Sequence, residues 1–188
     1  AIQWLRDGLQ IISTASETSK NAMNSKADDL VFVPAFAGLG APYWDMNVKG
    51  GIFGITRDIG INDLCKATLE SLAFQTRDVI VAMEKDAQLN LNTLAVDGGA
   101  CINDFLMQFQ SDILNAQVNR PITIESTALG AAYLAGIKTG FYDMNSLKKN
   151  HKIDRIFQPK KDLTLAKNKI INWDKAIQCL IKLHSSNE

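Results

Sequence analysis

The sequence predicts an α/β fold in which helices flank a sheet with neighbouring parallel strands. The second half of the chain alternates between segments of helical period and short apolar segments, which is the pattern of a layered α/β architecture. Two elements carry this prediction most clearly: a long amphipathic segment that starts at Asn62, and a strand–glycine–helix junction within residues 93–109. A chain of 188 residues with 46% hydrophobic and 21% charged residues is long and apolar enough to bury a real core.

The first half of the chain is predicted to contain one helix and two short strands. Apolar residues at steps of three and four predict a helix over residues 2–12. Residues 13–29 are rich in Ser, Thr, Asn, Lys and Asp and predict a surface connection. Strands are expected at residues 30–36, ended by Pro34, and at residues 51–55, with a glycine-containing loop between them.

The second half supplies the remaining elements. The long helix is expected to begin with Asn62 or Asp63 as its cap. The elements expected after it are a strand at 93–96, a helix from about 103 to 114, a strand at 116–122 ended by Pro121, a helix at 126–140 closed by Gly140 as a C-cap, a basic loop at 148–161 and a last helix at 173–183.

Charge, cysteine content and hydropathy restrict the class of protein. Twenty basic and twenty acidic residues give no sign of nucleic acid or an anionic membrane as partner. No apolar run reaches the roughly 20 residues of a membrane span, and no signal peptide is visible, so we expect a cytoplasmic protein. Because the chain starts at Ala1 within an apolar-periodic segment, we also expect it to be a piece of a longer protein.

The cysteines and histidines give little raw material for metal or nucleophilic chemistry. Cys65, Cys101 and Cys179 are widely spaced in apolar segments, which indicates buried, reduced thiols. His151 and His184 lie at no ligand spacing from them, so no metal site is expected. No pair of acids is placed to act together, and we assign no catalytic residue to this chain.

Two common phosphate-binding fingerprints are excluded. The segment "GLGAPY", residues 38–43, begins like G-x-G-x-x-G but lacks the last glycine, and Pro42 stands where the helix should begin. The chain contains no G-x-x-x-x-G-K-[S/T]. A dinucleotide-binding fold and a P-loop enzyme are therefore both rejected.

The stretch "TLAVDGGACINDFLMQF", residues 93–109, is the strongest candidate site. A strand that ends in Asp-Gly-Gly and leads into a helix exposes bare main chain at the carboxyl edge of a sheet, where ligands of open α/β sheets bind. Gly98 and Gly99 would let a flat ring or a phosphate approach closely, and Asn103 would face the same ligand. The alternative is that the glycines only make a tight turn and that Asn103 is only a helix cap.

Two further segments have a structural and a functional interpretation. The helix within residues 125–136 has a face of small residues, which favours close packing on a sheet or another helix over a ligand site. Tyr43, Trp44 and Asp45 lie in the glycine-containing loop between the two strands predicted in the first half of the chain. They could bind a polyol, but we favour the interpretation that they anchor the loop.

Taken together, these segments resemble the C-terminal half of the glycerol kinase branch of the FGGY carbohydrate kinase family. Three stretches carry the resemblance: "VPAFAGLGAPYWD" at residues 33–45, the family's second signature at residues 50–79, and "VDGGACINDFLMQFQSDIL" with "TALGAAYLAG". It runs from Ile2 to about Tyr142, three quarters of the chain.

The resemblance implies an actin-like ATPase (ribonuclease H-like) C-terminal domain with a mixed sheet flanked by helices, lacking its first strands. Residues 1–188 would be the nucleotide-side domain, with a core at about 1–142 and a looser tail at 143–188. Gln3, Gly98, Gly99 and Asn103 map onto nucleotide-binding positions. The family transfers the γ-phosphoryl group of ATP, with Mg²⁺, to a hydroxyl of a small polyol, here glycerol.

The same resemblance limits what this chain can do alone. In the family, the catalytic aspartate, the glycerol-binding residues and the phosphate loop precede the segment seen here, so the N-terminal catalytic domain is absent and the isolated chain should be inactive. The expected partners are that missing domain, glycerol and ATP in the full-length enzyme, and a second copy in a homo-oligomer. A non-catalytic nucleotide-binding or interaction module, or a kinase of another polyol or sugar, remains an alternative.

Overall fold

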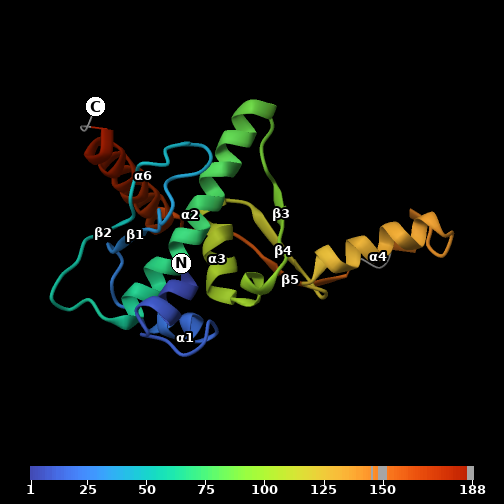
Figure 1. The fold of residues 1–188 in the computed structure, drawn as a ribbon, viewed down its shortest axis with the longest axis horizontal. Helices are drawn as coiled ribbons and strands as arrows, with labels where there is room; N and C mark the ends of the chain where they lie inside the picture. The colour runs from blue at the N-terminus through green and yellow to red at the C-terminus, as the bar shows by residue number, and fades with distance from the viewer. Residues whose placement is uncertain (145, 148–151, 186–188) are drawn as a thin grey trace.

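The structure, a computed structural model, describes residues 1–144, 146–147 and 152–185 (Figure 1). Its elements in chain order are the π-helix η1 (Trp4–Gly8), α1 (Glu17–Asn24), β1 (Val31–Val33), β2 (Gly51–Phe53), α2 (Ile61–Ala87), β3 (Thr93–Ala95), the 3₁₀-helix η2 (Gly99–Ile102), α3 (Asp104–Leu114), β4 (Gln117–Pro121), α4 (Ser126–Lys138), β5 (Ile153–Phe157) and α6 (Thr164–Ser185).

The strands confirm the mixed sheet. β3 pairs in parallel with β4, and β4 pairs antiparallel with β5, so that Val118 of β4 lies between Leu94 and Phe157. β1 and β2 form a separate antiparallel pair on the other side of α2 (Figure 1). The short β1 ends before Pro34, as the sequence predicts.

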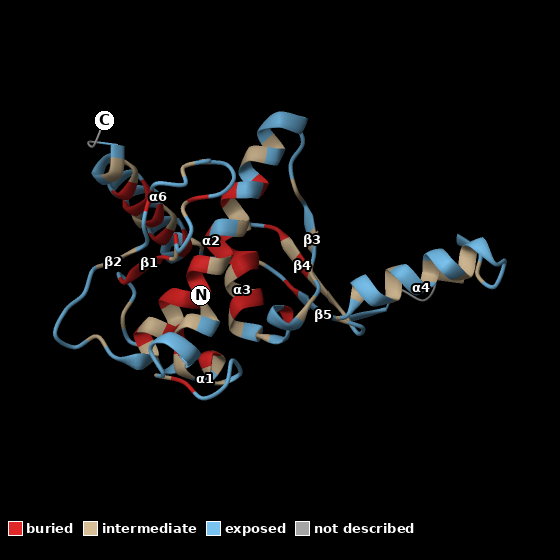
Figure 2. Ribbon diagram, viewed as in Figure 1, coloured by how far each residue is buried: buried red, intermediate tan, exposed pale blue. Residues whose placement is uncertain are grey.

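The core is built around α2. Figure 2 shows that buried residues gather where α2, α3 and α6 face one another. Phe74 of α2 stacks on Trp173 of α6 with ring centroids 5.0 Å apart, and it forms a T-shaped contact with Phe109 of α3 with ring centroids 5.4 Å apart. The predicted amphipathic helix is thus the element on which the other two helices pack. None of the described helices is long and apolar enough to cross a membrane.

The N-terminal segment differs from the prediction in two places. The first helix ends at Gly8 instead of residue 12, and Gln10 adopts a left-handed conformation with φ of 55°. Within the predicted connection 13–29, residues Glu17–Asn24 form α1. The helix was missed because its buried positions are Thr18 and Ala22, which give almost no apolar signal.

The start of α2 also differs. The helix begins at Ile61 with Gly60 as N-cap, so the predicted caps Asn62 and Asp63 are wrong. Asp63 instead occupies the third helical position, where its Oδ2 accepts a hydrogen bond from the Gly60 amide at 2.9 Å. The side chain satisfies the helix N-terminus from inside the first turn.

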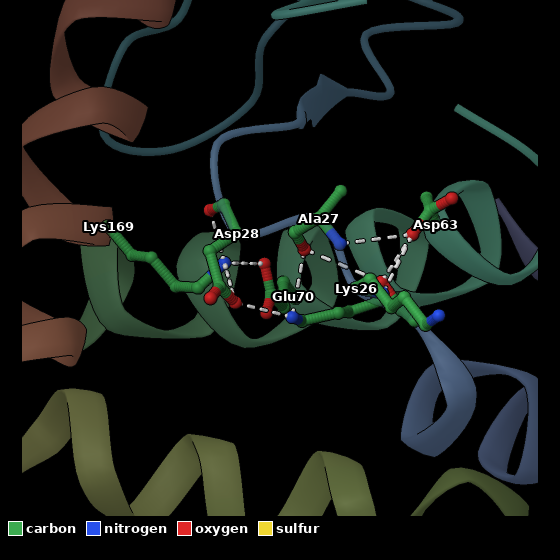
Figure 3. Close-up of polar contacts among 8 residues, drawn as sticks. Lys26, Ala27, Asp28, Asp63, Glu70 and Lys169 are labelled. Carbon is green, nitrogen blue, oxygen red and sulfur yellow. Dashed lines mark hydrogen bonds and ion pairs between the residues drawn. The ribbon is translucent and has the colours of Figure 1, made fainter. Parts of the chain in front are cut away.

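Asp63 also organises the chain before β1. Its Oδ1 accepts hydrogen bonds from Ser25 Oγ at 2.6 Å and from the amides of Lys26 and Ala27, each at 3.2 Å (Figure 3). Burial acts to raise the pKa of Asp63, but the four hydrogen bonds outweigh it and lower the pKa to about 2.

Acid should therefore remove stability that depends on Asp63. A carboxyl whose folded pKa is depressed stabilises the fold above its unfolded pKa near 4, and this contribution is lost as the pH falls toward 2. We expect the wild type to lose about 2 kcal/mol more than Asp63→Asn over this range of pH. Urea unfolding between pH 5 and pH 2.5 measures it, with the exposed Asp58→Asn as control. Equal acid sensitivity of Asp63→Asn and wild type would contradict this assignment.

The C-terminal third departs most from the sequence prediction. Residues Ile153–Phe157 of the predicted basic loop form β5, whereas residues 148–151 lie outside the described part. The helix predicted from residue 173 already begins at Thr164, because Ala166 and Lys169 face the core. Cys179 is exposed, which corrects the expectation of three buried thiols; Cys65 and Cys101 are buried.

The small-residue helix is not packed as predicted. α4 has no buried residue and extends away from the rest of the fold (Figures 1 and 2). Its Leu134 is 71% exposed. The C-cap is Thr139, with the predicted Gly140 next to it in a left-handed conformation. The described part of the chain therefore leaves the apolar side chains of α4 without cover.

Candidate nucleotide-binding turn

The candidate site is the turn between β3 and α3, at the carboxyl end of the parallel strand pair. The Val96 amide still donates to the Asn119 carbonyl of β4 at 3.1 Å, and the Gly98 amide donates to the Ile124 carbonyl at 2.8 Å. The 3₁₀-helix η2 then starts at Gly99. The chain thus leaves the strand, passes the glycines and makes one tight turn before α3, where the sequence suggested a direct entry.

Gly98 and Gly99 differ in backbone conformation. Gly98 has φ of 78° and ψ of 172°, a conformation open to glycine almost alone, so the turn itself requires it. Gly99 has no left-handed φ, and a Cβ built on it would meet no atom within 4 Å. Within the described chain, neither close neighbouring atoms nor a strained backbone conformation requires a glycine at position 99. The open space above it is what a ligand platform needs.

Asn103 is the N-cap of α3. Its Oδ1 accepts a hydrogen bond from the Leu106 amide at 3.1 Å, and its Nδ2 donates to Thr18 Oγ1 of α1 at 3.4 Å. The capping role that the sequence left open is therefore present. Its contact with a nucleotide stays a prediction.

Gln3 is exposed at the start of η1. The described residues show no hydrogen bond between its side chain and Gly98, Gly99 or Asn103. The fold therefore brings Gly98, Gly99 and Asn103 into one turn, while Gln3 lies on a separate element.

An arginine that the sequence analysis missed holds the turn. Arg120 of β4 donates from Nη1 to the carbonyls of Cys101 and Ile102, at 3.1 and 3.2 Å, and to Asp104 Oδ1 at 2.8 Å. Its Nε donates to Asp154 Oδ2 of β5 at 2.8 Å. The only sequence signal was a basic residue before Pro121 in a half-buried strand.

The acid before the glycines also has a structural partner. Asp97 accepts a hydrogen bond from Ser126 Oγ, which ties the end of β3 to the first residue of α4. Next to Ser126, a largely apolar cavity of about 410 Å³ lies between the end of β4 and α4. The residues that line it include Ile122, Leu129 and Tyr133. The turn therefore sits between the packed body and the uncovered helix.

Tyr43 anchors the glycine-containing loop. Its hydroxyl donates to Asp78 Oδ2 of α2 at 2.8 Å, whereas the neighbouring Trp44 is 76% exposed. Asp45 accepts from the Asn47 amide within the same loop at 3.0 Å. These contacts agree with the anchoring role that the sequence favoured for this segment.

The described residues do not form a metal site. Nowhere among them do three His, Cys, Asp or Glu side chains come together in a way that could hold an ion. The turn itself offers main-chain amides, a bare glycine surface and an asparagine. These groups can hold and orient a ligand, but they supply no nucleophile or general base.

The fold defines a class: an α/β domain of the actin-like ATPase fold, with a bare glycine turn at the carboxyl edge of its parallel strands. More specifically, the chain belongs to the FGGY family of carbohydrate kinases, because residues 1–139 match that family's C-terminal domain.

Relatives in sequence and structure agree with this membership. The chain is 53% identical over 179 residues to a glycerol kinase of Natranaerobius thermophilus and 50% identical to one of Pediococcus pentosaceus. These alignments cover 95% and 94% of this chain, but 36% of each relative. The crystal structure of Plasmodium falciparum glycerol kinase with ADP superimposes with a TM-score of 0.85 at 33% identity, over 95% of this chain and 36% of that one.

Proposed function

We propose that this chain is the C-terminal, nucleotide-binding part of an ATP-dependent glycerol kinase, which converts ATP and glycerol to ADP and sn-glycerol 3-phosphate. The observation that carries the proposal is about 50% identity, along nearly the whole chain, to relatives named glycerol kinase. We further propose that the chain is part of a longer protein, the full-length enzyme, because it spans about a third of the length of these relatives.

Within the full-length enzyme, the turn from Gly98 to Asn103 binds the adenosine part of ATP. The open surface over Gly99 supports this assignment, and so does the position of the turn at the carboxyl edge of parallel strands. Gly98 and Asn103 shape the turn next to the nucleotide, and Gln3 contributes from the N-terminal segment. The catalytic groups belong to the part of the enzyme outside this chain.

Activity assays test the division of labour. The full-length enzyme should form glycerol 3-phosphate and ADP, whereas the 188-residue chain with ATP, Mg²⁺ and glycerol should form none. Phosphorylation of glycerol by the chain alone would overturn the claim that it lacks the chemistry. A full-length enzyme that phosphorylates another sugar or polyol and ignores glycerol would overturn the proposed substrate.

Gly99→Val should weaken ADP binding to the full-length enzyme about tenfold or more, which corresponds to about 1.4 kcal/mol. The valine side chain would enter the open space over position 99, where a Cβ meets no atom within 4 Å, so the thermal unfolding temperature should change little. Isothermal titration calorimetry measures the affinity.

Gly40→Val is the matched control. A Cβ at Gly40 would also meet no atom within 4 Å, and Gly40 has no left-handed φ, but it lies in the glycine-containing loop, away from the turn. An unchanged ADP affinity in a folded Gly99→Val enzyme would remove Gly99 from the site.

The remaining partners follow from the same proposal. Mg²⁺ binds together with ATP. Because the described residues form no cluster of metal-ligating side chains, we assign no Mg²⁺ ligand to this chain. The uncovered α4 supports contact with the N-terminal part of the enzyme. A homo-oligomer and a cytoplasmic location complete the proposal, to be measured by sedimentation and by cell fractionation.

A further inference from the structure

Arg120 connects the central strand of the sheet to the main chain of the candidate turn. Its guanidinium contacts two consecutive carbonyls, those of Cys101 and Ile102, and one carboxylate of the following helix, Asp104. The Arg120 side chain is 13% exposed, so these bonds are partly shielded from water. Charge-assisted hydrogen bonds in such a setting are stronger than neutral ones.

Besides Arg120, the turn is held by the hydrogen bond from the Gly98 amide to the Ile124 carbonyl, by the buried Cys101 side chain and by the Asn103 side chain, which bonds to Leu106 and Thr18. η2 is a single 3₁₀ turn, closed by the Cys101 amide donating to the Gly98 carbonyl and the Asn103 amide donating to the Ala100 carbonyl. Short 3₁₀ turns have poor hydrogen-bond geometry, and adjacent glycines leave the backbone many alternatives. A conformation that presents a bare surface to a ligand therefore needs support from outside the turn.

Two residues of β5 hold the Arg120 side chain in place. Asp154 of β5 accepts from its Nε, and its guanidinium carbon lies 5.4 Å from the centre of the Phe157 ring. Phe157 is buried and belongs to the main core cluster. Arg120 therefore fixes the main chain of the turn relative to the paired strands β4 and β5.

We propose that Arg120 is a positioning residue, which holds the main chain from Gly98 to Asn103 in the conformation that accepts the nucleotide. This inference rests on the proposed nucleotide-binding function of the turn. It assigns Arg120 no contact with the nucleotide. Loss of the arginine should loosen the turn and weaken nucleotide binding while the remainder of the fold stays intact.

A neighbouring arginine provides a close control. Arg155 of β5 also pairs with Asp104, and its guanidinium carbon lies 4.7 Å from the centre of the same Phe157 ring. Its hydrogen bonds reach no carbonyl of the turn in the described structure. Arg155→Gln therefore removes the same charge and the same kind of ring contact without touching the bonds to the turn.

The test combines two measurements on Arg120→Gln, Arg120→Lys and Arg155→Gln. Amide hydrogen exchange on the 188-residue chain reports how firmly the turn is held, and ADP affinity of the full-length enzyme reports the consequence. In Arg120→Gln we expect exchange at Cys101 and Asn103 to rise, and ADP to bind more weakly, each about tenfold. Arg120→Lys should recover only part of this, because one ammonium cannot replace the planar fork. Arg155→Gln should change either quantity less than about twofold.

The outcomes separate this inference from the proposed function. Unchanged turn exchange in Arg120→Gln would overturn the positioning role, whatever the ADP affinity. Faster exchange without weaker ADP binding, in an enzyme where Gly99→Val does weaken ADP, would show that the Arg120 contacts do not serve the nucleotide. If neither Arg120→Gln nor Gly99→Val alters ADP affinity, the nucleotide assignment of the turn fails and this inference fails with it.

Discussion

Lys169→Met should lower the free energy of unfolding by about 3–5 kcal/mol near neutral pH, the largest loss expected for a single substitution here. Lys169 Nζ lies 2.9 Å from Glu70 Oε2 and donates to the Asp28 carbonyl at 2.7 Å (Figure 3). Lys169 and Glu70 are only 5% and 3% exposed. Removing the ammonium would leave a carboxylate buried without its cation, between α2 and α6.

The same substitution should make stability depend on pH. Burial raises the pKa of Glu70, against the attraction of Lys169, and without that ammonium the pKa must rise further. A group whose folded pKa is raised favours the folded state below its unfolded pKa, and this contribution is lost as the pH rises through the folded pKa. The Lys169→Met defect should therefore be smaller at pH 5 than at pH 8.

Chemical unfolding of a set of variants separates charge from volume. Lys169→Met combined with Glu70→Leu should restore much of the stability, because replacing both members of a buried pair by apolar residues is often neutral. Lys167→Met on the exposed side of α6 is the control and should change stability by less than about 0.5 kcal/mol. A single Lys169→Met variant as stable as wild type at pH 8 would mean that the pair does not hold α6 in place.

Asp78→Ala should cost about 3 kcal/mol by removing the carboxylate that accepts hydrogen bonds from Tyr43, Trp173 and Arg77. Its Oδ2 accepts hydrogen bonds from Tyr43 Oη and from Trp173 Nε1, both at 2.8 Å. Trp173 is 1% exposed, so its indole N–H would remain buried without a partner. The loss should appear in the midpoint of urea unfolding.

The phenol of Tyr43 gives a second readout of the same contact. Burial, and then the hydrogen bond and charge of Asp78, raise the pKa of Tyr43, so it should fall in Asp78→Ala. Absorbance titration of the three tyrosines measures this shift. Asp174→Ala is the matched control, because Asp174 is half exposed and pairs with Arg77 alone among the described contacts. Equal stability of the two variants would contradict the role given to Asp78.

The sequence was informative where apolar periodicity was strong. α2, α3 and the strands β1 to β4 follow from patterns that reflect a buried face, and the turn at Gly98 follows from a glycine pair between a strand and a helix. Polar residues at buried positions broke the pattern elsewhere. Thr18 concealed α1, and Lys169 concealed the first half of α6, because both are polar residues at buried positions. The Thr18 hydroxyl bonds to Ala15 and Asn103, and Lys169 pairs with Glu70.

Long-range pairing explains the remaining misses. β5 is exposed along most of its length and forms a strand because it pairs with β4, while its Arg155 pairs with Asp104. Arg120 became interpretable only when the fold placed it beneath the Cys101 and Ile102 carbonyls. For α4, the small-residue face predicted close packing, but the described chain buries no residue of this helix.

The central claim is that the turn from Gly98 to Asn103 holds the nucleotide. Titration of the ¹⁵N-labelled 188-residue chain with ADP, followed by amide chemical shifts, tests it directly. The largest saturable changes should fall on Gly98, Gly99 and Asn103, and Gly99→Val should suppress them. Saturable changes confined to other surfaces, such as the loop around Tyr43, with the amides of the turn unmoved, would contradict the claim.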